Sequence, residues 1–423
     1  MPSNQILNRQ KISIVVPEML PVPPVQGGAV EHWVHEVSKR LDQSKFEITI
    51  VSRPAYVAGV MGVKYEGITW TNLSRFFYSA KERLSKANPL RHLAKIQNVA
   101  TYGWQVAKLV RDADLVVIHN EPNLLLFLRR NTQQKVILHI HNEHLNIGLF
   151  RPLYRLALKS VDEVVCVSDY IRHSAIKHFP EYADKFSVVF NAVDPQIFKP
   201  YGQEAITQLQ NIVLIAPDKT YLLYVGRLNA LKGVHVLIEA FIKIHQQRPN
   251  TRLIIAGSSF FGGAAKTPYE ASLVTLAQPI AEAIIFTGFI PHDQLKYLYS
   301  AADIVVLPSV WQDPCPLVAL EAMASGTCLI ATQAGGVVEV LQHQINGWLV
   351  PPNNVEALRM AINELVDNSA KRAEMGEQAR KLIEQKYDWA RLVGQLETSF
   401  IKKSADIAIH AIDKQKNNIK VTQ

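Results

Sequence analysis

Short apolar runs rich in β-branched residues alternate with helical patterns along most of the chain, and this alternation constrains the fold more than any other feature. The runs end near glycine, proline or polar residues, as buried strands do. Strands that alternate with helices form parallel sheets covered by helices. The sequence therefore predicts an α/β fold with strands at 12–16, 48–51, 115–118, 136–140, 163–167 and 188–190 in the first half, and at 221–225, 253–256, 284–287, 304–307 and 329–331 in the second.

A turn-rich segment at 191–200, with the sequence NAVDPQIFKP, separates the two halves. Because a chain of 423 residues exceeds what one core usually organises, we predict two domains, 1–200 and 201–387, followed by a helix and a polar tail at 388–423. Open parallel sheets bind ligands at the carboxyl ends of their strands. If those edges of the two sheets face each other, they define one cleft, and function is expected in the loops that follow the strands.

Composition predicts an ordinary soluble protein. The chain is 48% hydrophobic and 19% charged, and it contains no apolar run near the roughly 18 residues that span a bilayer. Its first ten residues lack the apolar core of a secretion signal. The three cysteines form no CxxC pair, which favours a reducing compartment. We therefore expect a cytoplasmic protein. Its positive charge adds the alternative that it attaches to the inner membrane face.

The net charge of +8 and the isoelectric point near 9.2 indicate anionic partners. Nucleic acid is not predicted, because the sequence has no zinc-finger spacing, RNP motif or basic-zipper helix. Phosphate-bearing small molecules and an anionic membrane surface are the better candidates. Basic residues concentrate between Arg75 and Arg111 together with aromatic residues, so 75–111 is a candidate membrane contact. The alternative is a solvated basic helix face.

Three loops carry the features of phosphate sites. Each lies between a predicted strand and a helix, where helix N–H groups favour anions and glycine lets the backbone approach a ligand. The first contains Gly27 and Gly28 and the third contains Gly335 and Gly336. The second combines Gly226 and Arg227 with Lys232, whose two cations can neutralise a diphosphate. A simple turn or a solvated basic loop is the alternative for each loop alone.

The segment 309–326, SVWQDPCPLVALEAMASG, carries two carboxylates eight residues apart. Pro314 and Pro316 predict a helix start between Asp313 and Glu321. Asp313 at the mouth of that helix can accept hydrogen bonds from sugar hydroxyls, and Glu321 within it can accept both hydroxyls of a ribose. Taken singly, Asp313 reads as a helix cap and Glu321 as a surface helix residue.

With these strings in view, the chain resembles the retaining glycosyltransferases of family 4, also called group 1, which have the GT-B fold of two Rossmann-like domains. The resemblance extends from about residue 12 to residue 396. It rests on QGGAVEHWV, VCVSDYI, NAVDPQIFKP, YVGRLNALKG, FTGFIPHDQLKYLYSAADIVVLPS, DPCPLVALEAMASGTCLIATQAGGVVEVL and NGWLVPP.

The resemblance implies that the first domain binds the acceptor, that the second binds a nucleotide-sugar, and that the C-terminal helix returns to the first domain. It assigns the catalytic roles to Arg227, Lys232, Asp313 and His141, with His139 on the same strand face as a possible substitute for His141. It assigns donor binding to Gly27, Gly28, Gly226, Phe289, Ile290, Cys315, Leu317, Val318, Glu321, Gly335 and Gly336.

Three positions depart from the family pattern. Asp313 stands where glutamate is usual, Pro316 where glycine is usual, and Ala192 replaces the glycine of an NGVD pattern. The first two predict either a changed donor preference or reduced activity.

The implied reaction moves a sugar from a nucleotide-diphosphate-sugar to a glycan or lipid-linked acceptor of cell-surface polysaccharide or lipopolysaccharide, with no cofactor or metal. Attack occurs on the face that the diphosphate leaves, and the leaving phosphate accepts the proton. A metal site at Asp112-Ala113-Asp114 is disfavoured because this acidic pair precedes a strand, and a P-loop around 257–267 lacks a required glycine. The open alternatives are a sugar phosphorylase, a nucleotide-sugar epimerase, and a non-catalytic partner-binding homologue.

Overall fold

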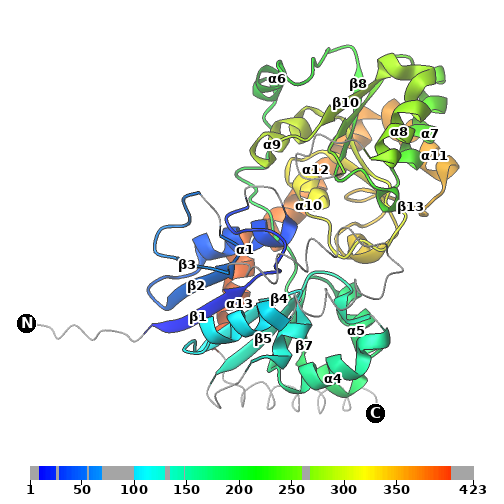
Figure 1. The fold of residues 1–423 in the computed structure, drawn as a ribbon. Coiled ribbons are helices and arrows are strands. Elements are labelled where there is room, and N and C mark those ends of the chain that lie inside the picture. Colours follow the sequence, from blue (N-terminus) through cyan, green and yellow to red (C-terminus); the bar gives the residue numbers. More distant parts are fainter. Residues whose placement is uncertain are drawn as a thin grey trace, which may run out of the picture. The chain divides into compact units, whose positions relative to one another are not determined.

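The computed structural model describes residues 9–24, 28–54, 57–68, 100–128, 134–146, 148–259 and 267–401. The chain divides into two compact units (Figure 1). Unit 1 comprises Met1–Val189 together with Val393–Gln423, and unit 2 comprises Phe190–Leu392.

Unit 1 is built on a parallel sheet whose seven described strands have the order β3-β2-β1-β4-β5-β6-β7. The strands are β1 (Gln10–Val15), β2 (Phe46–Ser52), β3 (Lys64–Gly67), β4 (Leu115–His119), β5 (Lys135–Ile140), β6 (Glu163–Cys166) and β7 (Phe186–Val188). Its helices include α1 (Ala29–Arg40), a helix at 100–109, α4 (Arg151–Lys159) and α5 (Asp169–Ile176), with the 3₁₀ turns η1 (Pro122–Leu126), η2 (His144–Asn146), η3 (Gly148–Phe150) and η4 (Pro180–Lys185). β4 and β5 are buried along their whole length, as the continuous apolar runs predict for central parallel strands.

Unit 2 repeats the plan with six described strands in the order β10-β9-β8-β11-β12-β13. The strands are β8 (Thr220–Val225), β9 (Thr251–Ala256), β10 (Ile284–Gly288), β11 (Ile304–Leu307), β12 (Cys328–Thr332) and β13 (Trp348–Val350). The helices are α6 (Gln203–Leu209), α7 (Val234–Gln247), α8 (Pro268–Ala277), α9 (His292–Ala301), α10 (Leu317–Ala324), α11 (Val355–Asp367) and α12 (Ser369–Lys386), with the turns η5 (Ala230–Lys232), η6 (Gln278–Ala283) and η7 (Gly335–Glu339). Every strand pair in both sheets is parallel.

Helices cover both faces of the unit 2 sheet, and alternate residues of one strand enter two separate cores. Leu223 of β8 belongs to the core formed with α9, α10 and α12, whereas Leu222 and Tyr224 belong to the core formed with α7, α8 and α11. This alternation is the two-residue period of a strand buried on both faces. The predicted α/β class with two Rossmann-like sheets is confirmed.

The turn-rich segment 191–200 belongs to unit 2 and is more than a linker. Val193 N–H donates to the Tyr387 carbonyl at 3.0 Å, and Phe198 is buried in the core of unit 2. The division therefore falls after Val189, whereas the sequence places it at 200. The last strand of unit 1 also lies two residues earlier than predicted, at Phe186–Val188, because Phe190 already packs against the core of unit 2.

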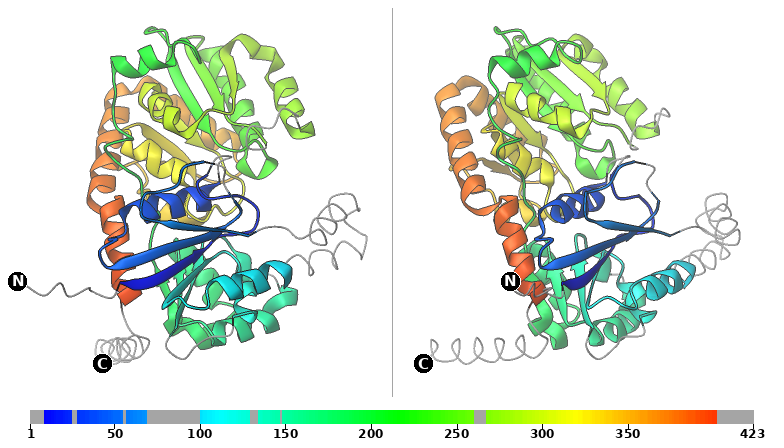
Figure 2. Two further views of the ribbon diagram at one scale, coloured as in Figure 1. Left: turned by 60° about the vertical axis from the view of Figure 1, so that its left-hand side comes forward. Right: turned by 90° about the vertical axis from the view of Figure 1, so that its left-hand side faces the viewer.

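The last described helix, α13 (Trp389–Ile401), returns to the sheet of unit 1, as expected (Figure 2). Glu397 accepts from the Asp42 N–H at 2.9 Å and pairs with Lys45 at 3.1 Å. Phe400 is buried and meets the ring of Phe46 with centroids 6.2 Å apart. None of the helices in the described ranges is long and apolar enough to cross a bilayer.

Candidate functional site

The loop after β8 in unit 2 places two cations next to tightly packed backbone. β8 ends at Val225 and Gly226 follows it. The Asn229 side chain accepts from the Lys232 N–H at 3.2 Å, which caps the short turn η5. Gly233 follows with φ +68°, and a Cβ there would lie 1.9 Å from the Pro308 carbonyl. Only glycine fits that approach, so the end of η5 is fixed against the end of β11.

The two cations of this loop differ in their surroundings. Arg227 is exposed, and no described residue accepts a hydrogen bond from its guanidinium, although its carbonyl accepts from the Tyr224 hydroxyl at 2.9 Å. Lys232 forms an ion pair with Asp313, and the two side chains are 21% and 12% exposed. The Lys232 ammonium also lies 5.9 Å from the centre of the Trp311 ring. The structure thus brings together Lys232 and Asp313, two residues that the sequence assigns to the reaction centre.

The third glycine loop is locked onto the Asp313 segment. The Gly336 N–H donates to the Asp313 carbonyl at 2.8 Å, and the Gly335 N–H donates to the Gln312 side chain at 2.5 Å. Gly335 has φ +67°, and a Cβ there would lie 2.0 Å from the Asp313 carbonyl oxygen. The glycines therefore serve close packing of two loops in this structure, and their N–H groups are engaged within the chain. Their predicted contact with phosphate stays a prediction that requires these bonds to be exchanged.

Glu321 lies on α10 with both carboxylate oxygens engaged. Its Oε1 is 2.7 Å from His292 Nε2, and its Oε2 accepts from the Tyr299 hydroxyl at 2.7 Å. Glu321 is buried, while the His292 side chain is 42% exposed. Burial beside this carboxylate raises the pKa of Tyr299 well above its usual value. An incoming ribose would have to replace the His292 contact, which is the more accessible of the two.

The remaining predicted donor-binding residues surround the start of α10 and the end of β10. Cys315 is buried, its carbonyl accepts from the Asn191 side chain at 3.1 Å, and burial raises the pKa of its thiol to about 12. Leu317 and Val318 form the partly exposed first turn of α10. Phe289 is 48% exposed just beyond β10, and Ile290 follows it.

In unit 1, Gly28 begins α1 with φ +104°. A Cβ at this position would lie 2.1 Å from Glu31 Oε2, so the glycine makes room for that carboxyl group. Glu31 is buried, and burial raises its pKa to about 7. Gly27 lies outside the described residues, as do residues 75–99 of the predicted basic membrane contact. Lys108 and Arg111, at the end of that stretch, are exposed.

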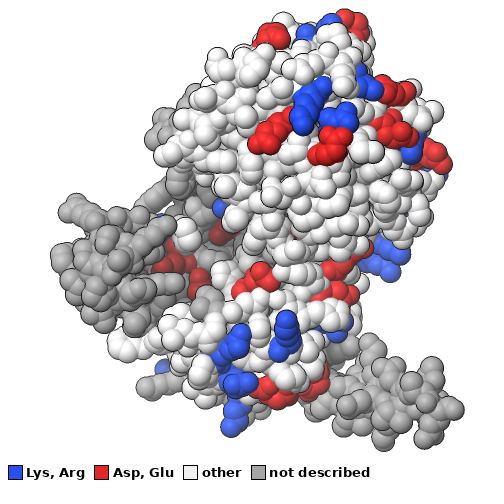
Figure 3. Space-filling model, turned by 90° about the vertical axis from the view of Figure 1, so that its right-hand side faces the viewer, with Lys and Arg blue, Asp and Glu red and all other residues white. Residues whose placement is uncertain are grey.

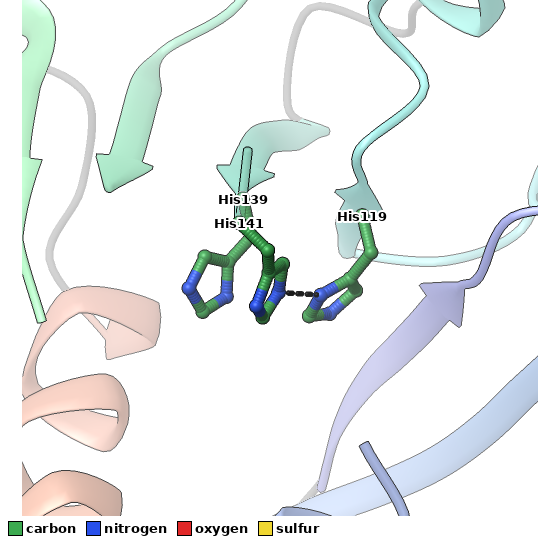
Figure 4. A group of neighbouring side chains, drawn as sticks. All are labelled: His119, His139 and His141. Carbon is green, nitrogen blue, oxygen red and sulfur yellow. Dashed lines mark hydrogen bonds between the residues drawn. The ribbon is translucent and has the colours of Figure 1, made fainter. Parts of the chain in front are cut away.

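His141 lies in a cluster of three histidines at the carboxyl ends of β4 and β5 (Figure 4). Its Nε2 is 2.9 Å from His119 Nδ1, and its ring stacks on that of His139 at 4.3 Å between centroids. The Asn120 side chain accepts from the His141 N–H at 2.7 Å. Trp33 of α1 covers the cluster, with its ring centre 4.6 to 5.5 Å from the three imidazoles.

Burial makes these histidines neutral. It lowers the pKa of His141 to about 3 and holds the pKa values of His119 and His139 well below their usual value. The ring nitrogens lie within 4.8 Å of one another, which is close enough for all three to bind one metal ion. However, the His141 ring is inclined by only 26° to His139 and 30° to His119. Lone pairs lie in the ring planes, so those of nearly parallel rings do not converge on one ion. A hydrogen-bonded neutral pair of His119 and His141, with His139 stacked on His141, fits this geometry better.

Comparison with known proteins identifies the family of the chain. A model described as "Glycosyl transferases group 1" matches residues 206–382, and one described as "Glycosyltransferase Family 4" matches residues 27–197. The chain belongs to the group 1 glycosyltransferases.

Relatives match this glycosyltransferase along most of its length. Spore coat protein SA of Bacillus subtilis is 29% identical over 393 residues, which are 91% of this chain and 98% of the relative. The lipopolysaccharide 1,2-N-acetylglucosaminetransferase of Salmonella typhimurium is 27% identical over 402 residues, 92% of this chain and 97% of the relative.

Solved structures share the fold. HepE from Anabaena, in complex with UDP and glucose, has a TM-score of 0.69 at 20% identity, covering 92% of this chain and 99% of HepE. Sucrose-phosphate synthase from Thermosynechococcus elongatus has a TM-score of 0.72 at 19% identity, covering 93% of this chain and 98% of the synthase. At these identities the likeness establishes the GT-B fold alone.

Sequence reasoning missed several residues that position the site of this glycosyltransferase. His119 had a usable signal, because it directly follows the strand predicted at 115–118, and the HIHN strand is the next one along the chain. In the structure His119 pairs in register with His139. Side chains in register on adjacent parallel strands share a face. Gln312, Tyr299 and His292 had none, since their contacts with Gly335 and Glu321 depend on loop geometry.

Proposed function

We propose that this glycosyltransferase moves a sugar from a nucleotide-diphosphate-sugar to a glycan or lipid-linked acceptor with retention of configuration and without a metal. The observation that carries the proposal is the ion pair between Lys232 and Asp313. The backbone of Asp313 is in turn held by Gly335 and Gly336. A cation held there and an exposed Arg227 supply two positive charges to a diphosphate.

The proposed roles follow from charge and position. Lys232 and Arg227 stabilise the diphosphate as negative charge develops on it, and Glu321 accepts the ribose hydroxyls after His292 yields its place. Asp313 orients the transferred sugar. Neutral His141 can offer either a donor or an acceptor to a hydroxyl, because its lowered pKa keeps it uncharged near pH 7. Catalysis then depends on orientation and charge stabilisation.

Two of the relatives support the substrate class. One is a lipopolysaccharide N-acetylglucosaminetransferase, and HepE was solved with UDP and glucose. We therefore propose a role in cell-surface polysaccharide or lipopolysaccharide synthesis, on the cytoplasmic side of the membrane, with a hexose or N-acetylhexosamine donor.

A thermal-shift panel tests the donor. Nucleoside diphosphates and nucleotide-sugars are compared with and without EDTA, and a bound ligand raises the melting temperature with concentration. We expect one diphosphate to stabilise the protein equally with EDTA present. Stabilisation that EDTA abolishes would contradict metal independence, and no stabilisation by any member would contradict donor binding.

Product analysis separates the proposed reaction from its alternatives. The anomeric configuration of the product, read by NMR, should match that of the donor. Sugar 1-phosphate formation from inorganic phosphate would indicate a phosphorylase instead. Conversion of the nucleotide-sugar without an acceptor would indicate an epimerase, and binding without turnover would indicate a non-catalytic homologue.

A further inference from the structure

The outer face of α4 and the preceding turn η3 expose an unusual amount of apolar surface. Leu149 is 86% exposed, Leu156 is 60% exposed, and Phe150 and Leu153 are 38% and 37% exposed. Single exposed apolar residues are normal, but a contiguous group marks a contact surface. Packing among the described residues of unit 1 leaves this group exposed.

The core side of the same helix is already complete. Tyr154, Ala157 and Leu158 are buried and fix α4 to unit 1. Leu153 and Leu156 are three positions apart, so they share a second face that points to solvent. α4 therefore has two apolar faces, and no residue in the described part of the chain buries the second one.

A row of cations accompanies the exposed leucines. Arg151, Arg155 and Lys159 are four positions apart and so lie in one row along α4, and residues 148–159 contain no acidic residue. Arg155 pairs with Glu181 at 2.6 Å, whereas Arg151 and Lys159 form no ion pair with any residue in the described part of the chain. On the face drawn in Figure 3, the Lys and Arg side chains in the lower part of the molecule lie among uncharged surface and a few acidic side chains.

We infer that η3 and α4 form a docking surface for an anionic lipid bilayer. Leucine side chains beside a row of basic residues on the polar flank are the pattern of a helix that lies in the membrane interface. The basic row complements anionic headgroups, which attract each nearby Lys or Arg. The surface consists of other residues than the stretch 75–111, and it does not rest on the proposed transfer reaction.

Vesicle sedimentation tests this inference with the full chain. We expect binding to vesicles of phosphatidylcholine with phosphatidylglycerol and weaker binding to vesicles of phosphatidylcholine alone. Leu149→Gln and Leu156→Gln should each lower the partition coefficient about tenfold, because each removes one leucine from lipid. Lys159→Gln should lower it about fivefold on anionic vesicles, and its effect should vanish on neutral ones.

Leu214→Gln is the matched control, since Leu214 of unit 2 is 77% exposed and lies outside the proposed surface. Equal losses for Leu214→Gln and Leu156→Gln, or no binding of the unaltered protein to anionic vesicles, would overturn the inference. The inference would also be overturned if Leu156→Gln converted a dimer to a monomer on size exclusion without changing vesicle binding. A second copy of the chain would then be the occupant. Turnover with a water-soluble acceptor should be unchanged in Leu156→Gln, so this test and the test of transfer fail separately.

Discussion

The carboxyl ends of the two sheets have the same topology and opposite chemistry. In unit 2 a lysine and an aspartate meet on partly exposed loops that glycines bring into backbone contact. In unit 1 the corresponding edge carries three neutral imidazoles under Trp33 and a carboxyl group, Glu31, whose pKa is near 7. Solvent access decides the difference, because burial without a partner of opposite charge favours the neutral form of each group. Under the proposed function, the charged loops of unit 2 would bind the phosphates and the neutral groups of unit 1 would contact hydroxyl groups.

The largest expected effect breaks the charged side of this comparison. Lys232→Ala and Arg227→Ala should each reduce turnover by roughly a hundredfold or more, as loss of a stabilising donor does elsewhere. Steady-state kinetics with a nucleotide-sugar measures this. Lys243→Ala, which removes an exposed lysine on α7, is the control and should act like the unaltered protein. Activity within a few fold of normal in both loop variants would refute the assignment of charge stabilisation to this loop.

The second prediction concerns the lock between the loops of unit 2. Gly335→Ala should lower the free energy of unfolding by about 2 kcal/mol, because a non-glycine residue at positive φ is strained. The added Cβ would also overlap the Asp313 carbonyl. Chemical denaturation measures the loss. Gly394→Ala is the matched control, since Gly394 lies in α13 with nothing near its Cβ position and should gain stability from helix propensity. A neutral Gly335→Ala would show that the close approach is not required.

The sequence predicts the secondary structure of the protein better than the contacts between its loops. Alternating strands and helices predict both sheets. The strand-end glycines were predicted to let the backbone approach phosphate, and in this structure Gly335 instead packs against the Asp313 backbone, so the contact with phosphate stays a prediction. The partners of those glycines were not predictable. Gly335 contacts Asp313 from 22 residues away, and its N–H is taken by Gln312. Likewise, nothing local in the sequence shows that Glu321 is held by Tyr299 and His292, because both lie on a different helix. Local patterns set the elements, whereas contacts between loops arise only in the assembled fold.

The third prediction tests the neutral side of the comparison. The folded-state pKa of His139 lies below its unfolded value near 6.5, so its stabilising contribution is complete above that pH and is lost as the pH falls. We expect unfolding free energy to fall by up to about 1.4 kcal/mol per pH unit for each such histidine. His139→Leu should make the unfolding free energy fall less steeply between pH 6 and 5, by the contribution of one histidine. Denaturation curves at the two pH values measure this.

Glu31 should act in the opposite direction. Its folded pKa of about 7 exceeds the ordinary pKa of a glutamate, 4.5, so its contribution is complete below pH 4.5 and is lost as the pH rises toward 7. Glu31→Gln should remove that loss. For His139→Leu the control is His173→Asn, because the His173 side chain is 70% exposed on α5. An unchanged acid slope in His139→Leu would mean that His139 is charged or solvated in the native state.

The smallest effect is expected from Asp313→Glu, and it separates two roles of one carboxylate. Glutamate keeps the charge for Lys232 but reaches one methylene further toward the sugar, so the ratio of kcat/KM for two nucleotide-sugars should change by about fivefold while turnover with the preferred donor persists. Asp313→Asn keeps the length and removes the charge, so it should lower turnover with every donor. If Asp313→Glu leaves the donor ratio unchanged and Asp313→Asn still lowers turnover, Asp313 positions Lys232 and does not contact the sugar. The specificity of unit 2 would then have to reside elsewhere on the loop that precedes α10.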